Sequence, residues 1–262
     1  MSVTEPTPRS GPAGGARPEA NEAPTSAGGV LHWGRERLRA GSWRGDAEVA
    51  YLNPVPGAPL PSPEFVRRCL RTLAGQGYAR VVTGALAPAE QAAFRAVGFQ
   101  PSEHLHLLSH DLRSVPPPAT GGGSLVLRRA SRSDRAGVLT IDGLAFDRFW
   151  RLDEAGLDEA LAATPHSRFR VAAVDDQVVG YAITGRAGRR GYLQRLAVDP
   201  SVQRRGIGSA LVLDALRWLR RWRAEQAMVN TQLDNEGALA LYERAGFRHE
   251  PSGLAVLAVD LR

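Results

Sequence analysis

The sequence has no lysine and a single cysteine, Cys69, among its 262 residues. One cysteine excludes a disulfide within the chain, and no apolar run approaches the roughly 20 residues needed to span a bilayer. The N-terminus also has no apolar segment of the kind that directs secretion. We therefore expect a cytoplasmic protein with no membrane partner. The absence of lysine excludes the phosphate-binding loop that ends in Gly-Lys-Ser/Thr.

All 33 basic residues are arginines, and the formal net charge is +6. Such a charge permits nucleic-acid binding. However, the arginines are scattered, and the densest group lies on a segment that also carries a leucine-rich apolar face. That group is Arg217, Arg220, Arg221 and Arg223. We expect a solvated helix face there and no nucleic-acid partner.

Two segments of unusual composition divide the chain. Residues 1–29 are rich in small and polar residues and have no aromatic side chain, which predicts a disordered tail. Residues 113–123, RSVPPPATGGG, predict a linker with a stiff part and a flexible part. We therefore expect an upstream domain at 30–112 and a downstream domain at 124–262.

The downstream segment alternates between strand-like and helix-like patterns, which predicts a mixed α/β sheet. The expected strands are 125–128, 169–174, 178–184, 191–198, 227–232, 247–248 and 254–261. The expected helices are 131–146, with Ser131 or Ser133 as its N-cap, 157–163, 210–223 and 235–245.

The most informative stretch is QRRGIGS, residues 203–209, between an expected strand and an expected helix. Backbone N–H groups in such a turn, together with the helix N-terminus, form a site for an anion. Gly206 and Gly208 let the backbone approach a phosphate without an intervening Cβ. The turn does not match the dinucleotide fingerprint Gly-x-Gly-x-x-Gly. It predicts a phosphorylated ligand, and the alternative is a tight turn that simply needs two glycines.

Two motifs resemble those of the GNAT acetyltransferase superfamily. LAVDP-x-x-Q-x-x-G-x-G, residues 196–208, resembles its acetyl-CoA-binding motif, and NEGALALYERAGF, residues 235–247, resembles its second conserved block. The resemblance covers about residues 124–262. It implies a GNAT fold and an N-acetyltransferase that uses acetyl-CoA and no metal.

The resemblance also implies a role for each motif residue. The N–H groups of the turn bind the pyrophosphate of CoA, and the two arginines add positive charge. The preceding strand pairs with the pantetheine arm, and the Val198 N–H polarises the thioester carbonyl. The implied cofactor contacts are Leu196, Ala197, Val198, Gln203, Arg204, Arg205, Gly206, Ile207, Gly208, Ser209 and Asn235, the last of which also caps its helix.

Tyr242 follows Asn235 by seven residues and therefore lies on nearly the same helix face. CoA leaves as a thiolate that needs a proton, and a phenol is protonated at neutral pH. We predict that Tyr242 is this general acid. The alternative is a tyrosine that only packs beside Phe247.

The general base is not apparent, because neither YLQR at 192–195 nor NTQ at 230–232 contains a carboxylate. The remaining candidates are Asp153, Glu154, His166 and Asp234, or a water held by Asn230 or Gln232. The acceptor is expected near residues 146–154. There, Phe149 and Trp150 are either core residues or an aromatic wall beside the amine.

The upstream segment contains a weak echo of the second motif. Gly98-Phe99 repeats Gly246-Phe247, and an alignment on this pair puts Phe94 at the position of Tyr242 and Ala87 at that of Asn235. A proline-rich stretch, 54–63, stands where the glycine-rich turn would be. We predict a degenerate GNAT-like half without a cofactor site, and an independent small α/β domain is the alternative.

These observations predict transfer of an acetyl group to a primary amine of a protein or peptide N-terminus or of a small molecule. We expect direct attack in a ternary complex, because no Cys–His or Ser–His pair is suggested. A non-catalytic acyl-CoA-binding regulator is the alternative, since the base is missing. A homodimer is left open.

Overall fold

The computed structural model describes residues 28–117 and 125–261. The predicted tail lies outside this range except for its last two residues. Of the predicted linker, only residues 113–117 are described, and they form no helix or strand. No helix within the described ranges is long and apolar enough to cross a membrane.

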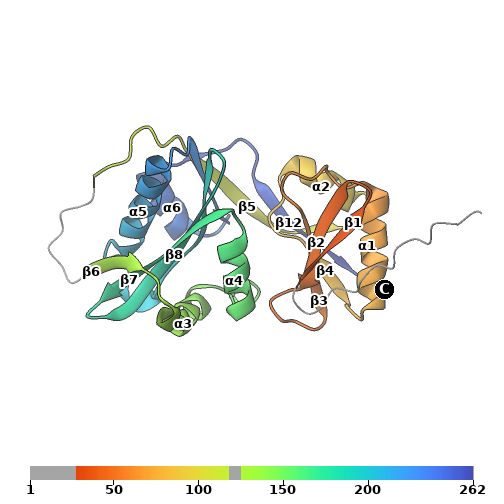
Figure 1. Cartoon of the computed structure of the whole chain (residues 1–262), viewed down its shortest axis with the longest axis horizontal. Helices are drawn as coiled ribbons and strands as arrows, with labels where there is room; N and C mark the ends of the chain where they lie inside the picture. The colour runs from red at the N-terminus through yellow and green to blue at the C-terminus, as the bar shows by residue number, and fades with distance from the viewer. Residues whose placement is uncertain (1–27, 118–124, 262) are drawn as a thin grey trace, which may run out of the picture.

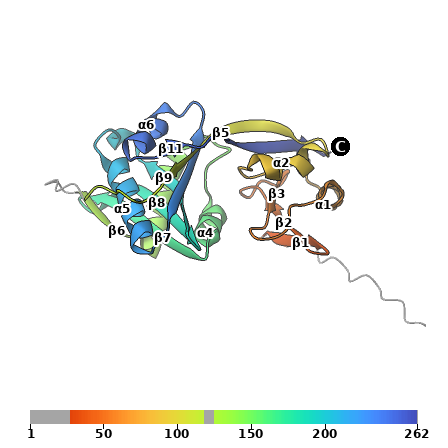
Figure 2. The same cartoon turned by 90° about the horizontal axis from the view of Figure 1, so that it is seen from above.

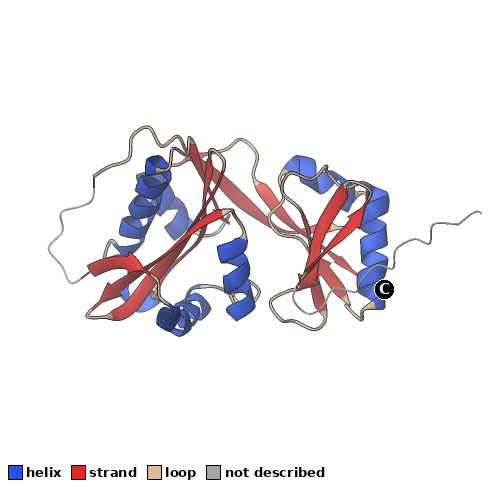
Figure 3. Ribbon diagram, in the orientation of Figure 1, coloured by secondary structure: helices blue, strands red, loops and turns tan. Residues whose placement is uncertain are grey.

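The chain forms two lobes that share one mixed sheet, so the predicted mixed α/β fold is confirmed (Figures 1 and 3). The strands are β1 (Gly29–Trp33), β2 (Glu36–Ser42), β3 (Val49–Pro54), β4 (Arg80–Val82), β5 (Gln100–His110), β6 (Leu125–Arg129), β7 (His166–Val174), β8 (Gln177–Ala187), β9 (Arg190–Val198), β10 (Gln226–Gln232), β11 (Arg248–His249) and β12 (Leu254–Asp260). The helices are α1 (Pro63–Gly75), α2 (Pro88–Arg95), α3 (Arg135–Ala145), α4 (Glu154–Ala162), α5 (Ile207–Arg221) and α6 (Glu236–Arg244). Short 3-10 turns cover Arg132–Asp134 and Pro200–Val202.

Two long strands cross between the lobes. The sheet order is β1-β2-β3-β4-β12-β5-β10-β9-β8-β7-β6, with β11 beside β5. Strand β5 belongs to the upstream part of the chain but pairs with β10 of the downstream lobe. Strand β12, the last in the chain, pairs with β4 of the upstream lobe. The two strands also pair with each other, and Figure 2 shows them side by side. Each lobe therefore receives its final strand from the other half of the chain.

The two halves repeat the same order of elements. The series β3–α1–β4–α2–β5 corresponds to β9–α5–β10–α6–β12, with a parallel strand pair at the start of each series. The ring centroids of Phe94 and Phe99 are 5.2 Å apart, and those of Tyr242 and Phe247 are 5.7 Å apart. Ala87 and Asn235 each stand at the N-cap of their helix. The origin of the upstream half as a degenerate copy of the downstream half stays a prediction.

Helices cover both faces of the downstream part of the sheet. Leu211, Leu216 and Tyr242 of α5 and α6 pack against one face, whereas Val138 and Ile141 of α3 pack against the other. In the upstream lobe, the buried faces of α1 and α2 pack on β1–β4 and β12. Successive residues of a strand face opposite sides of the sheet. A strand residue that belongs to one of these cores therefore faces the helices of that core, and the next residue faces the other side.

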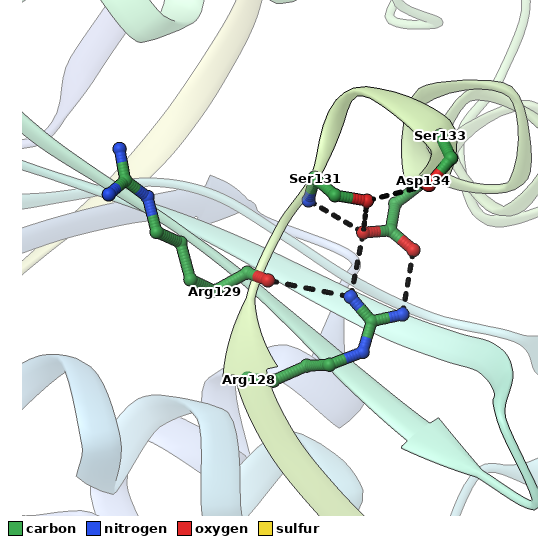
Figure 4. A network of polar contacts seen from close by, with 5 residues as sticks. All are labelled: Arg128, Arg129, Ser131, Ser133 and Asp134. Atoms are coloured by element: carbon green, nitrogen blue, oxygen red, sulfur yellow. Dashed lines mark hydrogen bonds and ion pairs between the residues drawn. The ribbon is translucent and has the colours of Figure 1, made fainter.

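The helix predicted from Ser131 to Phe146 begins instead at Arg135, after a 3-10 turn. Both guanidinium nitrogens of Arg128 donate to the carboxylate of Asp134 at 2.7 Å, and the backbone N–H of Ser131 donates to it at 2.6 Å (Figure 4). The hydrogen bonds from Arg128 hold the pKa of Asp134 far below its usual range. Ser131 therefore caps the 3-10 turn, and Ser133 caps nothing in this network.

Other elements differ from the prediction mainly at their ends. Helix α4 begins at Glu154, before the predicted Leu157, because the carboxylate of Asp153 accepts a hydrogen bond from the Gly156 N–H at 2.7 Å. Helix α5 begins at Ile207 rather than at residue 210. Strands β1 to β3 were not predicted at all.

Candidate active site

The glycine-rich turn joins the end of β9 to the start of α5. Gly206 is the N-cap, and its φ of 80° lies in the left-handed region that favours glycine. The side chain of Ile207 is buried and anchors the helix start in the core. The backbone N–H of Ala210 donates to the Gly206 carbonyl at 2.9 Å, so the three preceding N–H groups have no acceptor within the helix. An exposed turn with this geometry is suited to an anion.

The two glycines of the turn have different structural roles. At Gly206 a Cβ would meet no atom within 4 Å, so the residue is needed for its backbone conformation. At Gly208 a Cβ would lie 3.2 Å from Cδ2 of Leu241, so the absence of a side chain lets α5 approach α6. The second glycine thus has a packing role beyond the predicted approach to a phosphate.

Strands β9 and β10 separate after a short parallel contact. They pair only where residues 190–192 lie opposite 226–228. A bulge at Gln194 then shifts the register of β9 against β8, and β10 continues to pair with β5 as far as Gln232. Residues 193–198 of β9 therefore have a strand partner on one side only.

The pleat of β9 settles which backbone groups face the gap between β9 and β10. The Asp199 N–H donates to the Val179 carbonyl at 2.9 Å, so the N–H groups of Val198 and Leu196 point away from β8 and into the gap. The side chain of Gln203 donates to the Val198 carbonyl at 3.1 Å and ties the turn to the strand end. The prediction is corrected for Ala197, because its polar backbone groups face Tyr181 of β8.

The two residues of the second motif lie on α6. The side chain of Asn235 accepts a hydrogen bond from the Ala238 N–H at 3.0 Å, so it caps the helix as predicted. The Tyr242 side chain is 6% exposed and packs in the same core as Ile207 and Phe247. Burial raises the pKa of Tyr242 well above its ordinary value. The phenol is therefore protonated at neutral pH, as a general acid requires.

The loop between α3 and α4, residues 146–153, is held from both lobes. Trp43, in the turn after β2, stacks on Phe149 with ring centroids 5.0 Å apart and donates to its carbonyl at 3.2 Å. On the other side, Arg195 of β9 donates to the Trp150 carbonyl at 2.7 Å. Phe149 and Trp150 are half-buried, so they form a wall that the upstream lobe supports.

A buried ion pair fixes this loop to the bulge of β9. Asp142 of α3 is 0% exposed and accepts two hydrogen bonds from Arg195, each at 2.8 Å. It also accepts hydrogen bonds from the Leu152 N–H at 2.6 Å and from the Tyr181 hydroxyl. One carboxylate thus joins α3, the loop, β8 and β9.

The predicted general bases are mostly engaged or distant. Asp153 caps α4, and Glu154 lies 2.6 Å from Arg135 in an ion pair. His166 begins β7, in a hollow that Trp222 lines just past the C-terminus of α5. Since α5 has 15 residues, His166 is on the order of 20 Å from the glycine-rich turn, so the structure does not bring it to the site. Asp234 is exposed in the turn after β10.

The residues that the upstream half contributes were not predicted from the sequence. Trp43 packs on the loop, the Tyr51 hydroxyl donates to Glu159 of α4 at 3.1 Å, and Glu103 of β5 faces Trp150. These contacts join distant segments, so no local pattern could have indicated them.

The upstream lobe has no equivalent anion site at the corresponding helix. The N-cap of α1 is Ser62, and its N–H and hydroxyl both donate to the carboxylate of Glu36, the hydroxyl at 3.1 Å. A carboxylate of the chain itself thus stands at the helix N-terminus. The loss of the phosphate site in the upstream half stays a prediction.

Comparisons with known proteins point in one direction. Residues 137–247 match the model of the acetyltransferase (GNAT) family. Over 182 residues the chain is 29% identical to mycothiol acetyltransferase of Amycolatopsis mediterranei. The aligned region covers 62% of this chain and 60% of that protein. A shorter stretch of 59 residues is 41% identical to N-alpha-acetyltransferase 30 of Xenopus laevis and covers 22% of each chain.

The fold has a counterpart among solved structures. A tandem GNAT protein from the clavulanic acid biosynthesis pathway matches with a TM-score of 0.62 and 14% identity, over 90% of this chain and 79% of that one. At such identity the likeness concerns the fold alone. The chain spans about 60% of the length of the first curated relative that it matches.

Proposed function

We propose that this chain, whose residues 137–247 match the model of the acetyltransferase (GNAT) family, transfers an acetyl group from acetyl-CoA to a primary amine. The observation that carries the proposal is the exposed turn at the start of α5, beside the gap between β9 and β10 into which the Val198 N–H points. The turn can take the pyrophosphate, and the edge of β9 can pair with an extended amide chain.

Each step of the reaction has a group suited to it. The Val198 N–H is a fixed donor for the thioester oxygen as it gains negative charge. The amine nitrogen forms a bond to the carbonyl carbon, and the bond from carbon to sulfur breaks. Tyr242 gives its proton to the departing sulfur, which leaves as the free thiol of CoA. The proton that the nitrogen loses as it becomes an amide passes through water and restores the phenol. The turn and β9 hold the donor in place throughout.

We propose that the amine attacks the thioester directly, in a complex that holds both substrates. Cys69, the single cysteine, lies on the buried face of α1 in the upstream lobe, and burial raises its pKa to about 12. A thiol with such a pKa is not ionised at neutral pH and is a poor nucleophile. A covalent acetyl-cysteine intermediate therefore has no support.

The proposed function is tested by following CoA release from acetyl-CoA with a panel of amines. One relative is named for a small molecule, mycothiol, and another for N-alpha acetylation, so the panel contains a small-molecule amine, glucosamine, and an alanyl peptide. Mass spectrometry of the products locates the acetyl group. Tight acetyl-CoA binding without turnover of any amine would instead support an acyl-CoA-binding regulator.

Gly206→Ala is expected to raise the Kd for acetyl-CoA. A non-glycine residue at a φ of 80° is strained by about 1–2 kcal/mol, so the free turn relaxes and must be bent back for binding. This corresponds to roughly five- to thirtyfold weaker binding by calorimetry. Gly188→Ala is the matched control, because Gly188 has a φ of 57° and open space around it in the β8–β9 turn. Equal affinities of the two variants would contradict the assigned cofactor site.

A further inference from the structure

The proposed reaction needs a group that takes a proton from the acceptor amine, since an aliphatic amine is mostly protonated at neutral pH. Such a base has to lie on the face of the sheet that the α3–α4 loop covers. Strands β9, β10 and β5 lie side by side there. Which of their residues face the loop follows from the register.

The register places Glu103 on this face. Leu108 of β5 lies opposite Val229 of β10, and both belong to the core under α5 and α6. Residues at odd positions of β5 therefore point to the other face, toward the α3–α4 loop. The bulge between β5 and β12 lies beyond Glu103, which still pairs with Val256, so the alternation holds there. Asn230 and Gln232 of β10 share this face.

Glu103 is the sole acidic residue in the three strands. The neighbouring acids are engaged, Asp142 by Arg195 and Glu159 by the Tyr51 hydroxyl. Glu103 lies two residues beyond Leu105, which pairs with the last residue of β10, and thus at the open end of the gap.

The Trp150 side chain joins Glu103 to the acceptor loop. The Glu103 carboxylate lies beside the Trp150 side chain, which partly offsets the effect of burial on the pKa of Glu103. The Trp150 carbonyl accepts a hydrogen bond from Arg195, next to the bulge of β9. Asp147 and Asp234 also face Glu103, one from the loop and one from the turn after β10. The exposed His104 lies on the opposite side of β5. The negative charges of these two carboxylates surround Glu103 and attract a cationic amine.

We propose that Glu103, contributed by the upstream half on the crossing strand β5, is the general base for the acceptor amine. This inference rests on the proposed function. The carboxylate takes one proton from the ammonium, and the neutral amine then attacks the thioester carbon. The proton on Glu103 passes to water after the acetylated product leaves. Burial raises the pKa of Glu103, which makes it a better proton acceptor than an exposed glutamate.

The test compares Glu103→Gln with the wild type over a range of pH, with the alanyl peptide and glucosamine as acceptors. We expect kcat/KM for the amine to fall about 100-fold near pH 7, with acetyl-CoA affinity unchanged. Near pH 9.5 a peptide amine, with a pKa of about 8, is already neutral, so the deficit should shrink to less than about fivefold. A purely structural defect would persist at every pH.

Two variants serve as controls. Glu64→Gln removes an exposed carboxylate from the first turn of α1 and should leave kcat/KM unchanged. Glu103→Asp keeps a carboxylate and should recover part of the lost rate. The Glu103→Gln variant should fold normally. Burial raises the pKa of Glu103 in the folded protein, so the ionised carboxylate lowers the free energy of unfolding once the pH exceeds the pKa of the unfolded state. Removing this charge therefore does not destabilise the fold at neutral pH.

The possible failures are distinguishable. If the wild type acetylates an amine and the Glu103→Gln variant has the same pH profile, the role of Glu103 is overturned and the acetyltransferase function is left intact. A deficit of equal size at all pH values would make Glu103 a structural residue and also overturn the proposal. No wild-type turnover of either amine would contradict both the proposed function and this inference.

Discussion

Replacing Tyr242 with phenylalanine is expected to lower kcat at neutral pH by at least about tenfold, with the affinity for acetyl-CoA nearly unchanged. The substitution removes only the hydroxyl, and the ring keeps its contact with Phe247. Without a proton donor, CoA must leave as a thiolate. Because burial raises the pKa of Tyr242, the wild type should keep its activity at alkaline pH up to at least about pH 10.

Steady-state CoA release over a pH series measures both effects. Tyr78→Phe, in the core of the upstream lobe, is a control for loss of a phenol far from the site. An unchanged kcat in Tyr242→Phe would remove the residue from the acid role and leave it as a packing residue. A large change in acetyl-CoA affinity would show that the hydroxyl serves binding rather than proton transfer.

Asp142→Ala is expected to destabilise the protein by about 3–5 kcal/mol, because it leaves the guanidinium of Arg195 buried without a counter-charge. Thermal unfolding should show a fall in Tm of roughly 10 °C for a chain of this size. The same substitution frees the α3–α4 loop, since the Asp142 carboxylate also accepts a hydrogen bond from the Leu152 N–H. The KM for the amine should therefore rise as well.

The double variant Asp142→Leu with Arg195→Met removes both charges and should recover most of the lost stability. Asp158→Ala is the exposed counterpart, because Asp158 pairs with Arg135 at the surface, and it should cost less than about 1 kcal/mol. If Asp142→Ala were no more destabilising than Asp158→Ala, the buried pair would not be what holds the loop.

The site could be predicted from the sequence where it depends on local chemistry. Gly206 at the start of α5 and Asn235 at the start of α6 are set by turn and cap preferences within a few residues. The identification of β12 as a strand also rested on local pattern. The strand with which β12 pairs could not be predicted in this way, because LAVLAVD is apolar up to its last residue and fits the upstream or the downstream lobe equally well.

Long-range contacts account for the rest. Strand β2, ERLRAGS, carries Arg37 and Arg39 on one face, and this masked the alternation of Leu38 and Ala40 on the other. The candidate bases were sought within the downstream half, since nothing in the local sequence of β5 indicates that it lies beside β10. Glu103 reaches the site only through pairing between segments more than 100 residues apart.

The crossing of β5 and β12 bears on how such a protein can evolve. An upstream half whose helix N-terminus is closed by Glu36 would ordinarily be free to be deleted. A deletion up to the linker, however, would remove β5, an interior strand, and expose the unpaired edge of β10. It would also leave β12 without β4 and β5. The upstream half is therefore retained because each half supplies a strand to the other lobe, and the gene can lose either half only by rebuilding the other.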